Sequence, residues 1–239
     1  MTILFEDADI VALDKPAGVL THGTIRSLDE EGQEETAEDW FKKKYPEVVL
    51  ERPYVHRLDR DTSGVLVFAK NQTAYDFLRK AFTDREVKKT YVAVVHGVPK
   101  EKKGVIDFDI GRSRKDFRLR SAQPKAKGKL REAITRYEVI GEAEENGARY
   151  ALLELHPETG RTHQIRVHLK AIHHPVIGDP LYAPKNAPDF GIGRLALHAY
   201  SLDLPLPSGG RQNIIAPIPP DLATVLTRFR SASERFAGS

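Results

Sequence analysis

The sequence contains no cysteine among its 239 residues. Disulfide bonds, zinc sites built from thiolates and cysteine nucleophiles are therefore excluded. Any chemistry must rest on carboxylates, histidines, hydroxyl groups or basic side chains.

Long apolar segments are also missing. No run approaches the roughly 18 residues that a membrane-spanning helix needs. The segment 1–7 already includes Glu6 and Asp7, and it lacks the basic and apolar regions of a secretory signal. We therefore expect a cytoplasmic protein with no membrane partner.

The formal net charge is only +3, but the charges are segregated along the chain. Acidic residues gather in segment 27–39 and cations in segment 112–131. The cations of the second segment are Arg112, Arg114, Lys115, Arg118, Arg120, Lys125, Lys127, Lys129 and Arg131. A basic segment of this kind can neutralise backbone phosphates and bind nucleic acid in a salt-dependent way. A solvated loop or hairpin without a ligand explains the charges equally well.

Hydrophobic patterns predict both strands and helices. Runs rich in β-branched and aromatic residues predict strands over 10–13, 65–69, 90–95, 150–155 and 195–202. Thr36, with Asp39 three residues on, and Asn71 are the expected N-caps of two helices. The residues expected to be buried in these two helices and in a last one are Trp40, Phe41, Tyr45, Ala74, Phe77, Leu78, Ala81, Phe82, Leu222, Val225, Leu226 and Phe229.

Another helix is predicted from Thr162 to a point before Pro175. Ile165, Leu169 and Ile172 form one apolar line along it. A second line contains His163, Arg166 and Lys170. Taken alone, this pattern is typical of a surface helix with a polar face.

The predicted helices and strands are interspersed without a regular βαβ alternation, and no internal repeat is visible. We therefore expect an α+β fold with a mixed, largely antiparallel central sheet in two lobes and flanking helices. The length suits a single catalytic domain over residues 1–239.

Two polar clusters could carry chemistry. Segment 54–64 places a histidine, two arginines, two aspartates and two hydroxyls in a loop that leads into a predicted strand, where catalytic groups often lie. Segment 159–169 places cations and Gln164 at the start of a helix, where unpaired amides attract phosphate. In isolation, a capped turn would explain segment 54–64 equally well, and a surface helix with a polar face would explain segment 159–169.

Together, however, the two clusters resemble the signature motifs of the RluA-type family of pseudouridine synthases. His56-Arg57-Leu58-Asp59, followed by Thr62-Ser63-Gly64, is similar to the family's motif around its catalytic aspartate. Three further blocks occur in the family's order, at 13–18 (LDKPAG), 89–93 (KTYVA) and 160–168 (GRTHQIRVH). The resemblance covers roughly residues 3–204. It implies the same α+β fold and an isomerase that flips a uridine out of structured tRNA or rRNA and rejoins its base through carbon.

The resemblance also implies roles for single residues. Asp59 corresponds to the catalytic carboxylate, Tyr91 to the active-site tyrosine and Arg166 to the basic partner of the aspartate. An ionised carboxylate can act as a nucleophile or a base at the sugar, and a nearby arginine would keep it charged. A tyrosine can stack on uracil and move the proton from carbon 5. The other residues expected to bind the substrate are Arg57, which would fill the gap left by the extruded base, and Ile165, His56, Thr62, Arg161 and His163.

Among the cations of segment 112–131, we expect Arg118, Arg120, Lys125 and Lys127 to bind RNA. The first motif block starts by Leu13, which leaves no room for the small RNA-binding domain that many relatives carry ahead of the catalytic one. Recognition is therefore expected to come from the catalytic domain itself, acting as a monomer. Lys15 either lies near the site or is simply solvated.

No metal and no cofactor are expected. His163 and His168 are five residues apart, which differs from the i, i+4 spacing of a helical zinc pair.

Two other interpretations remain open. A glycosidase or nucleoside hydrolase needs a second carboxylate, for which Asp61 is the nearest candidate. An RNA-binding protein of this fold without activity would not need Asp59, Tyr91 and Arg166. Incubation with a uridine-containing RNA distinguishes the three interpretations. A synthase isomerises the uridine without a change in mass, a glycosidase releases the base, and an inactive protein only binds.

Overall fold

The computed structural model describes residues 1–23, 35–113, 119–122 and 126–229. The chain divides into two compact units. Unit 1 comprises Met1–Lys88 and Ala199–Pro217, and unit 2 comprises Lys89–His198 and Ile218–Ser239.

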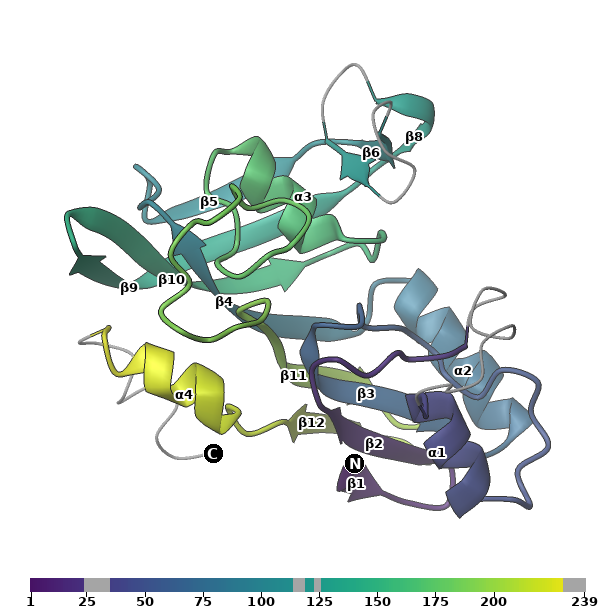
Figure 1. Cartoon of the computed structure of the whole chain (residues 1–239). Coiled ribbons are helices and arrows are strands. Elements are labelled where there is room, and N and C mark those ends of the chain that lie inside the picture. The colour runs from purple at the N-terminus through teal and green to yellow at the C-terminus, as the bar shows by residue number, and fades with distance from the viewer. Residues whose placement is uncertain (24–34, 114–118, 123–125, 230–239) are drawn as a thin grey trace. The chain divides into compact units, whose positions relative to one another are not determined.

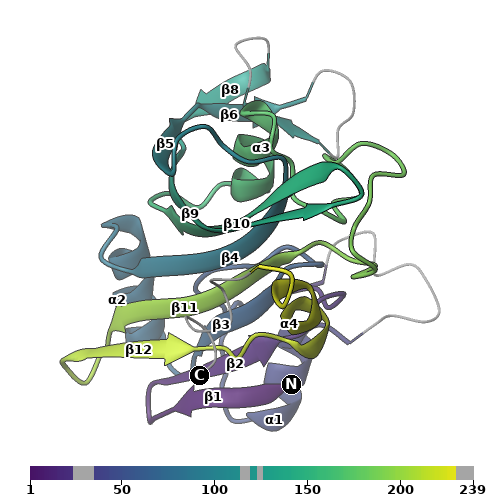
Figure 2. The ribbon, with the colours of Figure 1, turned by 90° about the vertical axis from the view of Figure 1, so that its left-hand side faces the viewer.

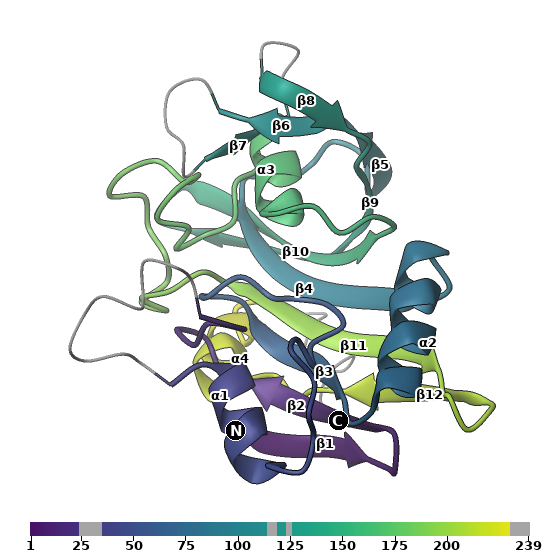
Figure 3. The ribbon, with the colours of Figure 1, turned by 90° about the vertical axis from the view of Figure 1, so that its right-hand side faces the viewer.

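Unit 1 is a sheet with two helices on one face. Its strand order is β1 (Thr2–Glu6), β2 (Ile10–Lys15), β3 (Ser63–Ala69) and β11 (Leu197–Pro205), and β12 (Arg211–Ile215) pairs with β11 outside this linear order. The pairs β1–β2, β2–β3 and β11–β12 are antiparallel. Helices α1 (Ala37–Lys44) and α2 (Gln72–Thr83) cover the same face, in front of the sheet in Figure 3 and behind it in Figure 2.

The core of unit 1 forms between this sheet and its helices. Every residue of β3 is buried, which fits its continuous apolar run. Phe41 of α1 stacks on Phe68 of β3 with ring centroids 4.8 Å apart, and Ala74 and Leu78 of α2 are fully buried. Phe77, which the pattern placed in the core, is 38% exposed.

Both predicted helix caps are confirmed. The Thr36 hydroxyl accepts the Asp39 N–H, and the Asp39 carboxylate accepts the Thr36 N–H in return. The Asn71 side chain accepts the Ala74 N–H at 2.8 Å. Caps of this kind satisfy amide donors that the first helical turn leaves unpaired.

The described residues of unit 2 form two sheets. The larger is antiparallel, in the order β4 (Lys88–His96), β10 (Ala148–Pro157), β9 (Ile134–Glu145) and β5 (Lys103–Asp107). The smaller has the order β7 (Arg120–Ser121), β6 (Ile110–Arg112) and β8 (Lys127–Arg131), and we call it the basic sheet. A last helix, α4 (Pro220–Leu226), buries Leu222, Val225 and Leu226 as predicted.

Helix α3 (Gln164–Ala171) lies between β9–β10 and the basic sheet (Figures 1 and 3). Its residues Gln164 to Leu169 are all buried. The expectation of a surface helix with a polar face is therefore wrong, because protein covers it on two sides. Arg166 in particular is only 4% exposed.

The α+β fold class is confirmed, but the patterns missed several strands. β9 was missed because its twelve residues alternate only weakly and its sequence, ITRYEVIGEAEE, is rich in charge. β12 lies in a segment that contains several prolines, and the basic sheet lies in one rich in turn formers. Short, half-exposed strands lack the apolar run on which such predictions depend.

Two buried polar side chains of α3, Gln164 and His168, share one network. The Gln164 Nε2 donates to the Thr135 hydroxyl at 3.1 Å, and its Oε1 accepts the Thr159 hydroxyl at 2.8 Å. His168, one turn further on, has Nδ1 3.0 Å from the Thr135 hydroxyl and Nε2 3.0 Å from the Phe108 carbonyl. A carbonyl only accepts, so Nε2 carries the ring proton and Nδ1 accepts from Thr135.

Burial lowers the pKa of His168, although the Phe108 carbonyl and the Asp107 charge oppose this effect. A neutral ring satisfies the whole network. A second ring proton, on Nδ1, would remove the acceptor to which the Thr135 hydroxyl donates, while the hydroxyl oxygen already accepts from Gln164.

This network should make the fold sensitive to acid. Because the pKa of His168 is lower in the folded than in the unfolded chain, its contribution to stability should be lost as pH falls below about 6.5. We expect the free energy of unfolding, measured with urea at pH 7.5 and pH 5.5, to fall less in His168→Asn than in the wild type. Equal losses would mean that other groups set the acid sensitivity.

Candidate active site

Asp59 lies on a loop of unit 1 between two paired segments. Before the loop, the chain runs beside β3, where the Pro53 carbonyl accepts the Ala69 N–H at 2.8 Å. After it, the chain enters β3. Asp59 is partly exposed, and its carbonyl accepts the Thr62 N–H at 3.1 Å in a tight turn. The backbone of Asp59 is therefore held in place, although the residue as a whole is not buried.

Both ends of this loop are fixed. The His56 Nε2 accepts the Val67 N–H of β3 at 3.1 Å, and its ring stacks on Phe82 of α2 with centroids 5.0 Å apart. Gly64 has φ +116°, and a Cβ there would lie 2.2 Å from the Ala199 carbonyl oxygen of β11. Only glycine fits this close approach, which explains the glycine of the Thr-Ser-Gly motif.

Lys15 of β2 is fully buried below the loop. Its Nζ donates to the carbonyls of Pro16 at 2.8 Å, Val19 at 2.7 Å and Arg60 at 3.0 Å. An ammonium group has three donors, and here all three find oxygen partners. A solvated Lys15 is therefore excluded, and the side chain instead holds the residue that follows Asp59.

Thr21 holds the residue that precedes Asp59. Thr21 is only 2% exposed. Its hydroxyl accepts the Leu58 N–H at 3.1 Å and donates to the Leu58 carbonyl at 2.9 Å. Gly18 and Arg60 add two reciprocal bonds of 2.9 Å. Segment 15–21, which begins within the first motif block, thus clamps the backbone on both sides of Asp59.

Arg57 is exposed on this loop, near an aromatic pair. The ring of Tyr54 stacks on His22 with centroids 4.8 Å apart and planes 6° apart. Burial raises the pKa of Tyr54, and the Glu38 charge adds to the effect, whereas Arg52 and Arg57 oppose it. Tyr54 is therefore a neutral, flat neighbour of the arginine expected to enter the RNA.

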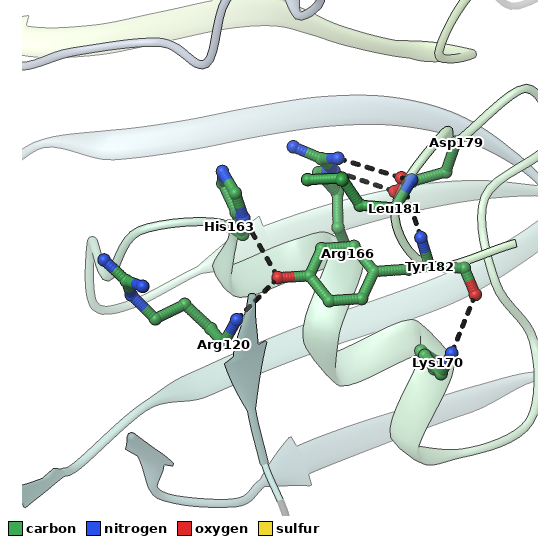
Figure 4. Close-up of polar contacts among 7 residues, drawn as sticks. All are labelled: Arg120, His163, Arg166, Lys170, Asp179, Leu181 and Tyr182. Carbon is green, nitrogen blue, oxygen red and sulfur yellow. Dashed lines mark hydrogen bonds and ion pairs between the residues drawn. The ribbon is translucent and has the colours of Figure 1, made fainter. Parts of the chain in front are cut away.

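In unit 2, Arg166 forms a buried, bidentate ion pair with Asp179 (Figure 4). Its Nε and Nη2 each lie 2.8 Å from one carboxylate oxygen. The Asp179 Oδ1 also accepts the backbone N–H groups of Leu181 and Tyr182. Asp179 was missed from the sequence, where Gly178-Asp179-Pro180 is typical only of a turn.

The remaining predicted residues of unit 2 lie around α3 and on β4. Tyr91 is partly exposed on β4 opposite Leu155, and Ile165 is 6% exposed.

The Arg161 Nε donates to the Glu132 carbonyl at 2.9 Å. His163 precedes α3 with φ +57° and lies 2.9 Å, through Nδ1, from the Tyr182 hydroxyl.

Of the cations expected to bind RNA, Arg120 lies on β7 and Lys127 on β8, whereas Arg118 and Lys125 lie outside the described residues. Three other cations of the basic sheet, Arg112, Lys129 and Arg131, are exposed.

Across the described ranges, no three histidine, aspartate or glutamate side chains gather as ligands for a metal ion. Nor does any described helix have the length and apolar character needed to cross a membrane.

Comparison with known proteins agrees with this arrangement of motifs. Residues 9–171 match the family model of RNA pseudouridylate synthases. An uncharacterised RNA pseudouridine synthase of Mycobacterium bovis is 41% identical over 233 residues, which cover 96% of this chain and 73% of that protein. The ribosomal large subunit pseudouridine synthase D of Borreliella burgdorferi is 33% identical over 241 residues, covering 98% and 70%.

Solved structures show the same relationship. Human RNA pseudouridylate synthase domain containing 1 superimposes with a TM-score of 0.75 at 27% identity, covering 91% of this chain and 83% of that one. The second such human protein, domain containing 4, gives a TM-score of 0.72 at the same identity, covering 95% and 92%. The chain therefore belongs to the RNA pseudouridylate synthase family. Enzymes of this family are isomerases that modify RNA.

The clamp around Asp59 predicts a specific loss of stability. Thr21→Val keeps the shape of the side chain but leaves the buried N–H and carbonyl of Leu58 without their partner. The free energy of unfolding should fall by about 1–3 kcal/mol. Thr21→Ser retains the hydroxyl and should lose less. Urea denaturation measures both, and equal losses in the two variants would contradict the clamp.

Proposed function

We propose that this chain converts a uridine of structured tRNA or rRNA into pseudouridine, with Asp59 as the catalytic nucleophile or base. The observation that carries this proposal is the double clamp on the backbone around Asp59, a residue that remains partly exposed. Burying an ammonium group is costly unless every donor is paired. A loop that only closed a turn would not need such a support, whereas a catalytic group requires a fixed position.

The proposed reaction rearranges bonds without changing mass. The bond between C1′ of the ribose and N1 of the uracil breaks, the base turns, and its carbon 5 bonds to C1′. Carbon 5 loses its proton and N1 gains one. A carboxylate at Asp59 could attack C1′ or remove a proton from the sugar, and either route starts this sequence.

Other motif residues enter the proposal on the strength of the motif match. Tyr91 would stack on the uracil and accept the proton of carbon 5, with Ile165 beside the base. Arg166 would serve as the basic group of the active site. Arg57, exposed on the Asp59 loop, would occupy the space that the flipped base leaves in the RNA.

We further propose that the two units act as one catalytic domain and as a monomer, and that the basic sheet contacts RNA phosphates. The name of the Borreliella relative supports ribosomal RNA, and transfer RNA is the other candidate. Mapping pseudouridines in total RNA from cells with and without this gene would decide between them.

Asp59→Asn provides the decisive test. The amide keeps the shape of the carboxylate but can be neither nucleophile nor base, so pseudouridine formation should fall by at least about 10²-fold. Mass spectrometry of nucleosides from treated RNA measures the product, and thermal melting confirms the fold. Asp61→Asn, in the same loop, is the matched control and should remain active. Full activity of folded Asp59→Asn would overturn the assignment, and release of free uracil would favour a glycosidase.

The basic sheet should set the salt dependence of RNA binding. Each phosphate contact contributes ~0.7 to 0.9 to the slope of log affinity against log salt. Replacing Arg112, Lys129 and Arg131 with alanine should therefore flatten this slope by ~2 to 3 units and weaken binding.

A control with the same change in net charge is available in unit 2. It replaces three cations that already pair with glutamates, namely Lys102, Lys103 and Arg149. We expect a smaller change in slope, measured by fluorescence anisotropy over a range of salt concentrations. If the first variant binds like the wild type, RNA docks on another surface.

A further inference from the structure

Tyr182 is a buried residue to which the sequence motifs assign no function. It is 3% exposed, and its hydroxyl contacts two separate elements of unit 2 (Figure 4). It accepts the backbone N–H of Arg120 on β7 at 2.9 Å and lies 2.9 Å from Nδ1 of His163. Both contacts are satisfied when the hydroxyl donates to Nδ1, which leaves the ring proton of His163 on Nε2.

On the side of the basic sheet, the contact holds its weakest strand. β7 has only two residues, which pair with β6 through Gly111–Ser121 and Arg112–Arg120. A two-residue edge strand has little stability of its own. The Tyr182 hydroxyl therefore supplies an anchor for β7 outside the sheet.

On the side of α3, the contact holds a strained residue. His163 is the N-cap of α3, its backbone is left-handed at φ +57°, and its side chain makes no cap hydrogen bond. A non-glycine residue in this conformation is strained, and it persists only where its surroundings hold it. The bond from the Tyr182 hydroxyl to the imidazole helps to hold it.

Further contacts extend along the helix. The guanidinium of Arg166 lies 5.1 Å from the centroid of the Tyr182 ring, and the Lys170 Nζ donates to the Tyr182 carbonyl at 3.1 Å. The Tyr182 N–H donates to Asp179, the partner of Arg166. His163, Arg166 and Lys170 form the polar line of α3, so this line packs on Tyr182.

We propose that Tyr182 is a positioning residue that couples the basic sheet to α3. RNA held by the cations of the sheet is thereby kept at a fixed distance from Ile165 and Arg166. The proposal rests on the proposed function, because it concerns how bound RNA is aligned with that site. Its key atom is the Tyr182 hydroxyl, which joins β7 to the first residue of the helix.

Tyr182→Phe removes this hydroxyl alone and keeps the ring under Arg166. Because small displacements of positioning groups reduce turnover strongly, kcat should fall by ~10-fold or more. The salt slope of RNA binding should stay as in the wild type, since no cation is lost, and the melting temperature should change by only a few degrees. The matched control is Tyr150→Phe. Tyr150 is equally buried in unit 2 but contacts the rings of His96 and Phe190, and its variant should keep the wild-type kcat.

A double-mutant cycle tests the route through His163. Glycine adopts positive φ without strain. In the His163→Gly variant, the backbone at position 163 therefore no longer depends on the Tyr182 hydroxyl. If Tyr182 acts through His163, Tyr182→Phe should lower kcat less in the His163→Gly background than in the wild type. An equal loss in both backgrounds would overturn this route.

A measurement without turnover separates this proposal from the proposed function. Hydrogen exchange of Tyr182→Phe should show faster exchange both in the peptide covering 119–122 and in the one covering 163–167. Unchanged exchange in either peptide, or an unchanged kcat in an active enzyme, would overturn the coupling. If the wild type forms no pseudouridine, the proposed function fails, and the exchange data still decide whether Tyr182 links the two elements.

Discussion

The arrangement of the Asp59 loop depends on one buried positive charge. The ammonium group of Lys15 is removed from water, and it is stable there only because three backbone carbonyls surround it. Two of these carbonyls belong to the adjacent turn and one to Arg60. The requirement to pair a buried cation therefore fixes the distance between two segments that are 45 residues apart in sequence. The shape of the Asp59 loop follows from this requirement and from the hydroxyl of Thr21.

Unit 2 also contains a buried cation, but its partner is of a different chemical kind. The buried cation is Arg166, and its partner is the carboxylate of Asp179. A planar guanidinium presents two parallel donors that match a carboxylate, whereas the three donors of an ammonium group suit separate carbonyls. The lysine therefore orders a loop through neutral backbone groups, and the arginine orders the 179–182 turn through a charge pair. In each unit a motif residue is also held by a partner outside the motifs, Leu58 by Thr21 and Arg166 by Asp179.

Local features were predictable from the sequence, and features that depend on distant segments were not. The caps Thr36 and Asn71 and the buried strand β3 are set by neighbouring residues, and each was predicted. The burial of α3 depends on β9 and the basic sheet, which cover it from two sides, and no periodicity within the helix reveals that cover. The same limit applies to the site. The motifs identify Asp59 and Arg166 as residues of interest, but the partners Thr21 and Asp179 lie where the pattern is typical only of loops and turns.

The assignment of Ala199–Pro217 to unit 1 has a consequence for how the chain folds during synthesis. β3 is entirely buried, yet its neighbour β11 is translated more than half the chain later. At ribosomal speeds, this delay is on the order of ten seconds. Throughout that time the nascent chain contains an apolar strand with one edge paired only in part, by segment 53–55. A strand of this kind can aggregate or recruit a chaperone. Unit 1 is therefore completed only after unit 2 has largely emerged, although its first residues are made first.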